Sequence, residues 1–334
     1  MKRTAESNRA LQCTCLAVAL SASGLACAAT SYSFTNFDGP GNNAGGTTIN
    51  AINNNGAVVG FSADDAATPT LLTNFIRNSD GTYTFPSTGG APLLTANGIN
   101  DGNNVVGTNG TVAVLLPPGQ TPIALPPAEG FNTASQAAFG INNAGVIVGQ
   151  ETNASSGFTP GFVDQNGKFT LLNPVVNATA TNAQAIDNNG LVAGFYSTDD
   201  VHQHGFLYDT KTSTFQLLSD PVVANLFLTQ FLGINNNGTA VGYWQDTAGS
   251  QHGFLYDIAS KQYTFLDDPN AAKSGRSITQ ITGINDSGEI AGFYVDSATG
   301  LQRGFIGIAA VPEPSAWALV AAGLAVVCFR RRIV

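Results

Sequence analysis

The 334-residue chain contains 13 Lys and Arg against 22 Asp and Glu, and only 10% of its residues are charged. A typical soluble domain has about 25% charged residues, so Asn, Gly, Ser and Thr must supply much of the surface polarity here, as suits a β-rich exported protein. Residues 29–311 hold 7 basic and 20 acidic residues, a net charge of −13. This charge repels nucleic acid and anionic lipid, and without a basic stripe the sequence excludes nucleic acid as a partner.

The first 28 residues have the layout of a secretory signal peptide. A basic start is followed by the apolar stretch Leu11–Leu25 and then by the A-x-A pattern Ala26-Cys27-Ala28. This arrangement predicts cleavage after Ala28, with Ala26 and Ala28 as the small residues of the cleavage site. Two alternatives are a first helix of the folded domain and lipidation of Cys27, although Gly24 stands where lipoproteins usually carry Leu.

All four cysteines lie near the two hydrophobic ends of the chain, at Cys13, Cys15, Cys27 and Cys328. The region between them therefore has neither a disulfide framework nor a cysteine-based zinc site. Its stability must come from its apolar core, for which about 280 residues suffice.

From Tyr32 onward, apolar and polar residues alternate, with turn residues about every 8–12 positions, which is typical of β-strands. An Ile-Asn or Ile-Asp motif recurs at steps of 47, 42, 45, 48 and 50 residues. Repeats of this length, each with four strand candidates, are typical of propeller blades, whereas a β-helix has shorter coils and a sandwich does not repeat. The sequence predicts an all-β fold, a six-bladed β-propeller over residues 29–310. The six isoleucines are Ile52, Ile99, Ile141, Ile186, Ile234 and Ile284.

Each repeat follows the same plan. The first strand ends in the Ile motif, and the Asn- and Gly-rich step after it predicts a hairpin turn, because these residues tolerate positive φ. The second strand contains a glycine in all six repeats, which weakens a strand unless another backbone or ring approaches closely. We expect the crowded centre of the propeller to be the reason. These glycines are Gly60, Gly107, Gly149, Gly194, Gly242 and Gly292.

The last repeat lacks a fourth strand, because the chain runs from Phe305 into Val311 and Pro312. The segment Phe34–Asp38 precedes the first Ile motif and aligns without gaps with the fourth-strand sequence Tyr263–Asp267. We therefore expect the N-terminal strand to pair with the last strand and close the ring, which removes an exposed edge.

Residues 29–311 also resemble extracellular repeats of the HAF type, which are named for a His-Ala-Phe-like triplet. Two repeats carry such a triplet, at His204–Phe206 and His252–Phe254, while others replace the histidine, for example by Pro160 or Arg303. The resemblance implies an exported repeat module, and it brings no established catalytic residues.

The tail, residues 311–334, combines a Pro-Glu-Pro motif, a short apolar span and an arginine cluster. The span Ser315–Phe329 would reach about 22 Å as a helix, short of a ~30 Å hydrocarbon core. We expect a short C-terminal hydrophobic helix that crosses a membrane marginally, with the arginines on the cytoplasmic side. The motif residues are Val311, Pro312, Glu313, Pro314 and Ser315, and the cluster is Arg330, Arg331 and Arg332.

This tail is similar to the PEP-CTERM sorting signal of Gram-negative bacteria that produce exopolysaccharide. The resemblance implies that an exosortase-type transpeptidase acts at Pro312-Glu313-Pro314. It also implies transient anchoring in the inner membrane, then a place at the cell surface or in the matrix of a biofilm, in association with exopolysaccharide. An ordinary C-terminal membrane anchor is the alternative.

The three histidines raise the question of a metal site. His202 and His204 are two residues apart, so on a strand both imidazoles could lie on one face, as a zinc site requires. However, His204 and His252 occupy the same position in successive repeats. We interpret them as parts of the repeat scaffold and predict no metal site.

Three acid pairs are candidates for general acid–base chemistry or for calcium binding: Asp64-Asp65, Asp199-Asp200 and Asp267-Asp268. Adjacent residues on a strand point to opposite faces, and no Asp-x-Asp-x-Asp-Gly loop is present. We interpret the pairs as solvated turn carboxylates, with adventitious calcium as the next alternative.

No nucleophile elbow, phosphate-binding loop or dinucleotide fingerprint occurs in the chain, so we predict no catalytic residues, no cofactor and no enzymatic activity. The function we expect is that of an exported structural or binding module. The alternative is a secreted propeller hydrolase or lyase acting on polysaccharide. Acidic residues converging at one mouth of the ring would favour the enzyme, and similar loops around the ring would favour the module.

Overall fold

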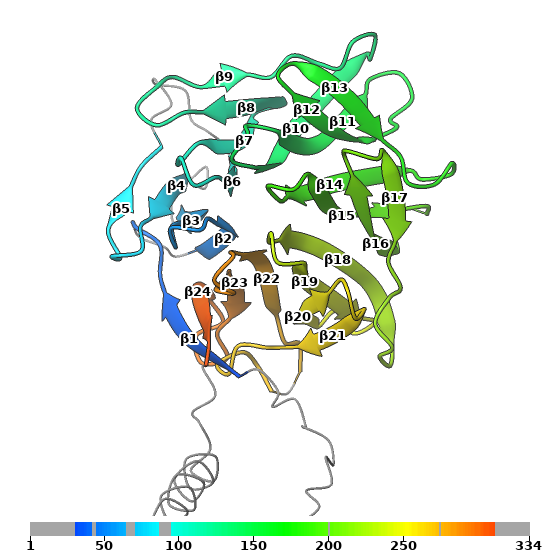
Figure 1. Cartoon of the computed structure of the whole chain (residues 1–334). Helices are drawn as coiled ribbons and strands as arrows, with labels where there is room; N and C mark the ends of the chain where they lie inside the picture. The colour runs from blue at the N-terminus through cyan, green and yellow to red at the C-terminus, as the bar shows by residue number, and fades with distance from the viewer. Residues whose placement is uncertain are drawn as a thin grey trace, which may run out of the picture. The chain divides into compact units, whose positions relative to one another are not determined.

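The computed structural model describes residues 31–41, 45–64, 71–86, 95–199, 201–273 and 275–310. Within these ranges the protein consists of six four-stranded antiparallel sheets that surround a common centre (Figure 1). The prediction of an all-β, six-bladed propeller is confirmed. The expected C-terminal hydrophobic helix lies outside the described residues.

Each sheet is one blade, and its first strand lies at the centre of the ring. Blades one to three are built by β2 (Gly46–Ile52), β3 (Val58–Asp64), β4 (Leu71–Arg77) and β5 (Tyr83–Thr84); by β6 (Thr95–Ile99), β7 (Val105–Asn109), β8 (Val112–Leu116) and β9 (Ile123–Ala124); and by β10 (Thr133–Ile141), β11 (Ile147–Asn153), β12 (Gly161–Gln165) and β13 (Lys168–Leu172).

Blades four to six are built by β14 (Ala180–Ile186), β15 (Leu191–Ser197), β16 (Gln203–Asp209) and β17 (Thr214–Leu217); by β18 (Leu226–Ile234), β19 (Thr239–Asp246), β20 (Gln251–Asp257) and β21 (Gln262–Phe265); and by β22 (Thr279–Ile284), β23 (Ile290–Val295), β24 (Gln302–Ala309) and β1 (Tyr32–Phe37).

Blade six joins the two ends of the propeller. Strand β1 pairs with β24 along its whole length, as Figure 1 shows at the junction of the blue and orange strands. The rings of Phe34 and Phe305 meet edge to face, with centroids 5.2 Å apart. Arg303 donates two hydrogen bonds, of 2.9 and 3.0 Å, to the carboxylate of Asp38. The predicted closure of the ring by the N-terminal strand is confirmed.

The core lies between the blades, because each blade buries both of its faces. In β16, Phe206 packs with Val163 of blade three, whereas its neighbour Leu207 packs with Phe231 of blade five. Burial of one such side chain contributes about 1.5–3 kcal/mol. The third-strand phenylalanines are completely buried in five blades, at Phe75, Phe162, Phe206, Phe254 and Phe305.

The repeated glycine of the second strand does have a close neighbour, but it is not at the centre of the ring. A Cβ on Gly194 would overlap the carbonyl oxygen of Asn182 in the first strand of the same blade, and the other five glycines meet the corresponding carbonyl. The crowding at the centre falls instead on the residue before each Ile. A Cβ on Gly233, for example, would lie 2.9 Å from the Cα of Gly283 in the next blade. This corrects the reason expected from the sequence.

Candidate functional site

A β-bulge interrupts the first strand of every blade, three residues before the repeated Asx residue of the turn and one before the small residue at the centre. A bulge leaves its extra residue unpaired and can redirect that side chain. The repeated glycine of the second strand makes room for the carbonyl of the residue two positions before the bulge residue. The six extra residues, which we call the bulge residues, are Asn50, Asn97, Phe139, Gln184, Leu232 and Thr282.

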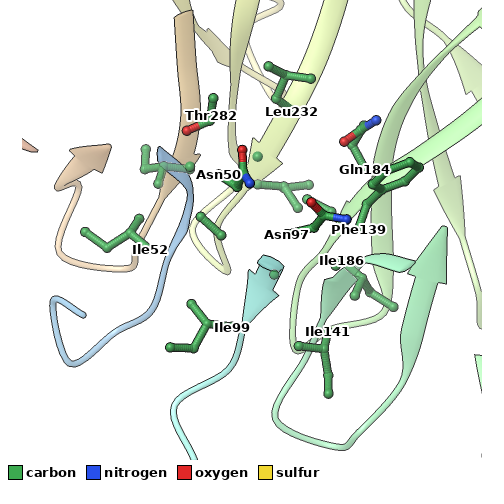
Figure 2. Close-up of a pocket in the computed structure, with 18 of the residues that line it drawn as sticks. Asn50, Ile52, Asn97, Ile99, Phe139, Ile141, Gln184, Ile186, Leu232 and Thr282 are labelled. Carbon is green, nitrogen blue, oxygen red and sulfur yellow. The ribbon is translucent and has the colours of Figure 1, made fainter. Parts of the chain in front are cut away.

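The bulge residues point into a cavity of about 270 Å³ at the centre of the propeller, which we call the central funnel (Figure 2). The six repeated isoleucines form its floor. None of the described residues that line the funnel is charged, and the lining consists of amide, hydroxyl, aliphatic and aromatic groups. The floor repeats from blade to blade, whereas the bulge residues differ in size and polarity.

Three of the bulge residues also connect neighbouring blades, and the hydroxyl of Thr282 donates to the carbonyl of Ile49 at 2.9 Å. The Nδ2 of Asn50 donates to the carbonyl of Ala96 at 2.8 Å, and the Nδ2 of Asn97 donates to the carbonyl of Ala138 at 2.9 Å. Their amide oxygens are not used in these bonds. Within the described residues, the side-chain amide of Gln184 has no hydrogen-bond partner, although it is only partly exposed. The funnel therefore offers neutral donors and acceptors.

A second cavity, of about 70 Å³, lies on the other side of the isoleucine floor and is surrounded by the Asn- and Asp-rich turns. The first polar residue of each turn is 2–7% exposed and caps its own turn; Asn235 Oδ1, for example, accepts the backbone N–H groups of Asn237 and Thr239. In five blades its Nδ2 also donates to a carbonyl of the next blade. We call these residues the inner Asx ring: Asn53, Asn100, Asn142, Asp187, Asn235 and Asn285.

The next residue of each turn completes a second ring. Its side-chain Oδ1 accepts the backbone N–H of the corresponding residue in the preceding blade at 2.7–2.9 Å, and this bond is made at all six junctions. The turns at this mouth are thus alike and connect the blades to one another. We call these residues the outer Asx ring: Asn54, Asp101, Asn143, Asn188, Asn236 and Asp286.

The carboxylates at this mouth serve as acceptors in that ring. Asp101 Oδ2 accepts the amides of Asn143 and Asn54, at 2.5 and 3.1 Å, and Asp286 Oδ2 accepts that of Asn236 at 2.6 Å. Burial tends to raise the pKa of Asp101, but these hydrogen bonds outweigh it and lower the pKa below its usual value. A general acid needs the opposite shift.

The histidines take equivalent places at the edge of two blades. His204 Nδ1 lies 2.7 Å from Asp220 Oδ2, and His252 Nδ1 lies 2.7 Å from Asp267 Oδ2. In blade six Arg303 takes the same place, which agrees with the interpretation of the histidines as scaffold residues. His202 pairs separately with Asp199. Among the described residues, no group of three or more His, Cys, Asp or Glu side chains could hold a metal ion.

The acid pairs differ from one another. The side chains of Asp199 and Asp267 are 47% and 36% exposed. Asp268 is only 3% exposed, and its Oδ2 has no hydrogen-bond partner, so the interpretation as a solvated carboxylate is wrong for this residue. Burial raises the pKa of Asp268. Asp65 and Asp200 lie outside the described residues.

The residues predicted for processing also lie outside the described residues. They are Ala26 and Ala28 of the signal cleavage site, Val311, Pro312, Glu313, Pro314 and Ser315 of the sorting motif, and Arg330, Arg331 and Arg332. In the part of the chain that is described, no helix has the length and apolar character needed to cross a membrane.

Comparison with protein families gives two matches. Residues 310–332 match the PEP-CTERM protein-sorting motif, which implies export and recognition by an exosortase. Residues 116–302, more than half of the chain, match the family described as protein of unknown function DUF3466. The chain belongs to the DUF3466 family. No curated protein matches this DUF3466 protein.

Several solved structures are similar to the DUF3466 protein at very low sequence identity. Trypanosoma rangeli sialidase is 11% identical, with a TM-score of 0.50 over 87% of this chain and 61% of the sialidase. Pyrococcus horikoshii acylaminoacyl peptidase is 13% identical (TM-score 0.43, 78% of this chain and 51% of the peptidase). Oligogalacturonate lyase from Vibrio parahaemolyticus is 9% identical (TM-score 0.45, 86% and 99%). The DUF3466 protein therefore spans half to two thirds of the first two, and the likeness shows the fold alone.

The bulge residues were not identified from the sequence of this DUF3466 protein. The available signal was the position two residues before each repeated Ile. That position varies from repeat to repeat, whereas the residue after it is always Gly or Ala. A variable residue inside an otherwise repeated motif indicates a place where the scaffold does not determine the side chain.

Proposed function

We propose that this protein is an exosortase-sorted structural and binding module of the cell surface or extracellular matrix of a Gram-negative bacterium, associated with exopolysaccharide. The observation that carries the proposal is the sorting motif at residues 310–332, which follows directly on a closed propeller whose last strand ends at Ala309. Residues 1–28 serve as the signal peptide, residues 29–310 form the propeller of HAF-type repeats, and residues 311–334 direct sorting.

Two features support a binding or structural module over a polysaccharide hydrolase or lyase. The turns of the two Asx rings are similar around the whole mouth, and their carboxylates accept hydrogen bonds from neighbouring blades. The described lining of the central funnel contains no ionisable group, whereas glycoside hydrolysis ordinarily uses two carboxyl groups. The proposal therefore includes no catalytic residue and no cofactor.

The test of sorting compares the full chain in a host that has an exosortase and in the same host without it. We expect the first host to release a form that begins at Ala29 and lacks Cys328, and the second to retain the tail in its membrane. Replacing Arg330, Arg331 and Arg332 by Gln should also reduce release, because positive charge holds the tail in its orientation. Intact mass spectrometry identifies the released form.

The exposed Lys273→Gln variant is the control for loss of positive charge, and it should be released like the wild type. Released protein that still contains Cys328, or equal release from both hosts, would contradict the proposal. The association with exopolysaccharide is tested separately, by co-sedimentation of the released protein with polymer isolated from the same host. A released protein that stays in the supernatant at every polymer concentration would contradict that part.

A further inference from the structure

We propose that the central funnel binds one neutral sugar residue, either as a free monosaccharide or as the end of a glycan chain. This inference rests on the proposed function as a binding module and names the ligand of its site.

The first observation is that the bulge forms with several different side chains at its extra residue. The bulge geometry is the same in all six blades, and the residue after each bulge is always Gly or Ala. The bulge residues nevertheless range from Thr282 to Phe139 in size and from Leu232 to Gln184 in polarity. Asn50, Asn97 and Thr282 hold neighbouring blades together, as described above. Within the described residues, the side chains of Phe139, Gln184 and Leu232 make no hydrogen bond between blades, so the variation among these three indicates a ligand without sixfold symmetry.

The volume of the funnel limits what can enter. At about 270 Å³ it lies near the lower end of the ~300–1,000 Å³ that is typical of small-molecule pockets. One sugar ring fits such a space, whereas an oligosaccharide or a peptide segment would have to remain largely outside. The bulge residues other than Thr282 are partly exposed, so the funnel is accessible from solvent.

The polar groups of the funnel match hydroxyl groups. A hydroxyl both donates and accepts, and the free amide of Gln184 offers both functions. The amides of Asn50 and Asn97 are held in place by their bonds to Ala96 and Ala138, so their oxygens are positioned before any ligand arrives. Groups ordered in advance lose less conformational entropy when a ligand binds.

The apolar groups match the C–H face of a sugar ring. Phe139 lies between Asn97 and Gln184 in the order of the blades, and it lines the funnel (Figure 2). The face of an aromatic ring is electron-rich and attracts groups with positive polarisation, such as the C–H bonds of a sugar. Leu232 and the isoleucine floor add apolar surface that a hydrated ion would not use.

The funnel also selects by charge. An acidic sugar would bring its carboxylate into a site whose described lining contains no cation, and burying an unpaired charge is unfavourable. The net charge of −13 over residues 29–311 adds a repulsive field. A neutral hexose avoids both costs. Comparing the affinity for each hexose with that for the matching hexuronate therefore distinguishes this site from a surface that binds sugars regardless of their charge.

The experiment titrates the full-length protein with glucose, galactose, mannose and N-acetylglucosamine, and with glucuronate and galacturonate, by isothermal calorimetry. We expect saturable binding of at least one neutral sugar and at least tenfold weaker binding of the matching hexuronate. Gln184→Leu should weaken binding at least tenfold. The control is Gln216→Leu, which makes the same change at an exposed position of the same blade and should leave the affinity unchanged.

Leu232→Trp provides a second variant, which fills the funnel and should abolish binding while the melting temperature confirms that the blades are formed. Methyl glycosides and disaccharides of the bound sugar show whether the natural ligand is a free monosaccharide or the end of a glycan chain. A site for chain ends binds these compounds, whereas a site for free sugars rejects them. No binding of any of the four neutral sugars, equal binding of hexuronates, or full affinity in Gln184→Leu would overturn the inference. Sorting is read from the mass of the released chain, so failure here is distinguishable from failure of the proposed function.

Discussion

Gly194 illustrates how one residue of the repeat positions the candidate site. It has no side chain, so the carbonyl of Asn182 can approach it just before the bulge at Gln184, which lines the central funnel. An unusual φ angle is not the reason, because Gly194 has no positive φ. The same relation holds in each of the other blades.

We expect Gly194→Ala to lower the free energy of unfolding by about 1–3 kcal/mol, because the added methyl group overpacks the junction between β14 and β15. Urea denaturation measures the effect. The control is Gly102→Ala, where the added methyl would meet only the side chains of Asn104 and Asn100, and a change within about 0.5 kcal/mol is expected. Equal stability of both variants would show that the bulge does not depend on the glycine.

The buried carboxyl group of Asp268 should make the stability of the folded protein depend on pH. Burial raises its pKa above the ordinary value of 3.8, so the folded protein binds this proton more tightly than the unfolded chain. The contribution to stability is present below pH 3.8 and is lost as the pH rises through the folded-state pKa. We expect Asp268→Asn to remove this loss, so that the variant gains stability relative to the wild type between pH 4 and pH 7, measured by urea midpoints.

Asp257→Asn serves as the control, because the pKa of Asp257 is shifted in the opposite direction from that of Asp268. Hydrogen bonds from the side chain and backbone of Ser260 lower the pKa of the exposed Asp257, so its contribution is present above pH 3.8 and is lost as the pH falls. The stability advantage of the wild type over Asp257→Asn should therefore be present near neutral pH and disappear as the pH falls below 3.8. A wild type and an Asp268→Asn variant with parallel pH profiles would contradict the assignment of a raised pKa.

At the scale of elements, β1 is the strand on which the closed ring depends. It covers the edge of β24 and carries Phe34, which contacts Phe305, and it is followed directly by Asp38, which contacts Arg303. The contact between Arg303 and Asp38 corresponds to the pairs of His204 and His252 in the two preceding blades. The blade that joins the chain ends thus uses the same edge contact as blades made from continuous sequence.

We expect deletion of residues 31–38 to expose β24, because its outer hydrogen-bonding partners would be lost. Amide hydrogen exchange should become faster in Gln302–Ala309, and the melting temperature should fall. Exchange in β13 (Lys168–Leu172), an outer strand of blade three, serves as the internal control and should change little. Unchanged exchange in β24 would show that the ring remains closed without β1.

At the scale of the whole molecule, the two Asx rings connect all six blades through side chains. The outer ring is complete, whereas the inner ring lacks one bond because Asp187 has no Nδ2 to donate to the carbonyl of Asn235. The five asparagines of the inner ring make the corresponding bond to the next blade. One position therefore departs from the rule that the other five follow.

We expect Asp187→Asn to complete the inner ring and raise the free energy of unfolding by about 0.5–1.5 kcal/mol, the net value of one hydrogen bond. The new Oδ1 can still accept the N–H of Leu191, which Asp187 accepts at 2.7 Å. The long bond of 3.3 Å from Asn189 Nδ2 to Asp187 Oδ2 would be lost, but Asn189 Nδ2 keeps its bond to the carbonyl of Asn236. The reverse change, Asn142→Asp, removes a donor to the carbonyl of Asp187 and should destabilise by about 1–3 kcal/mol. Urea midpoints that shift in the same direction for both variants would contradict this role.

Sequence alone determined the features that are local or repeated. The spacing of the isoleucines indicated six blades, the Asn- and Gly-rich steps indicated the turns, and the likeness of Phe34–Asp38 to Tyr263–Asp267 indicated how the ring closes. Each of these signals depends on strand alternation or on turn conformation, which neighbouring residues decide. The sorting motif could also be recognised, because it is defined by a short linear pattern.

Only the tertiary structure decided which residues meet across the blades. The bulge residues are brought together from six first strands that are 42–50 residues apart in sequence, and both Asx rings depend on the same separation. Asp268 reads as a turn carboxylate in the sequence, yet it is buried where blade five meets Asn36 of the closing strand. Burial and convergence of this kind arise from closing the ring, so a repeat pattern that describes one blade at a time does not contain them.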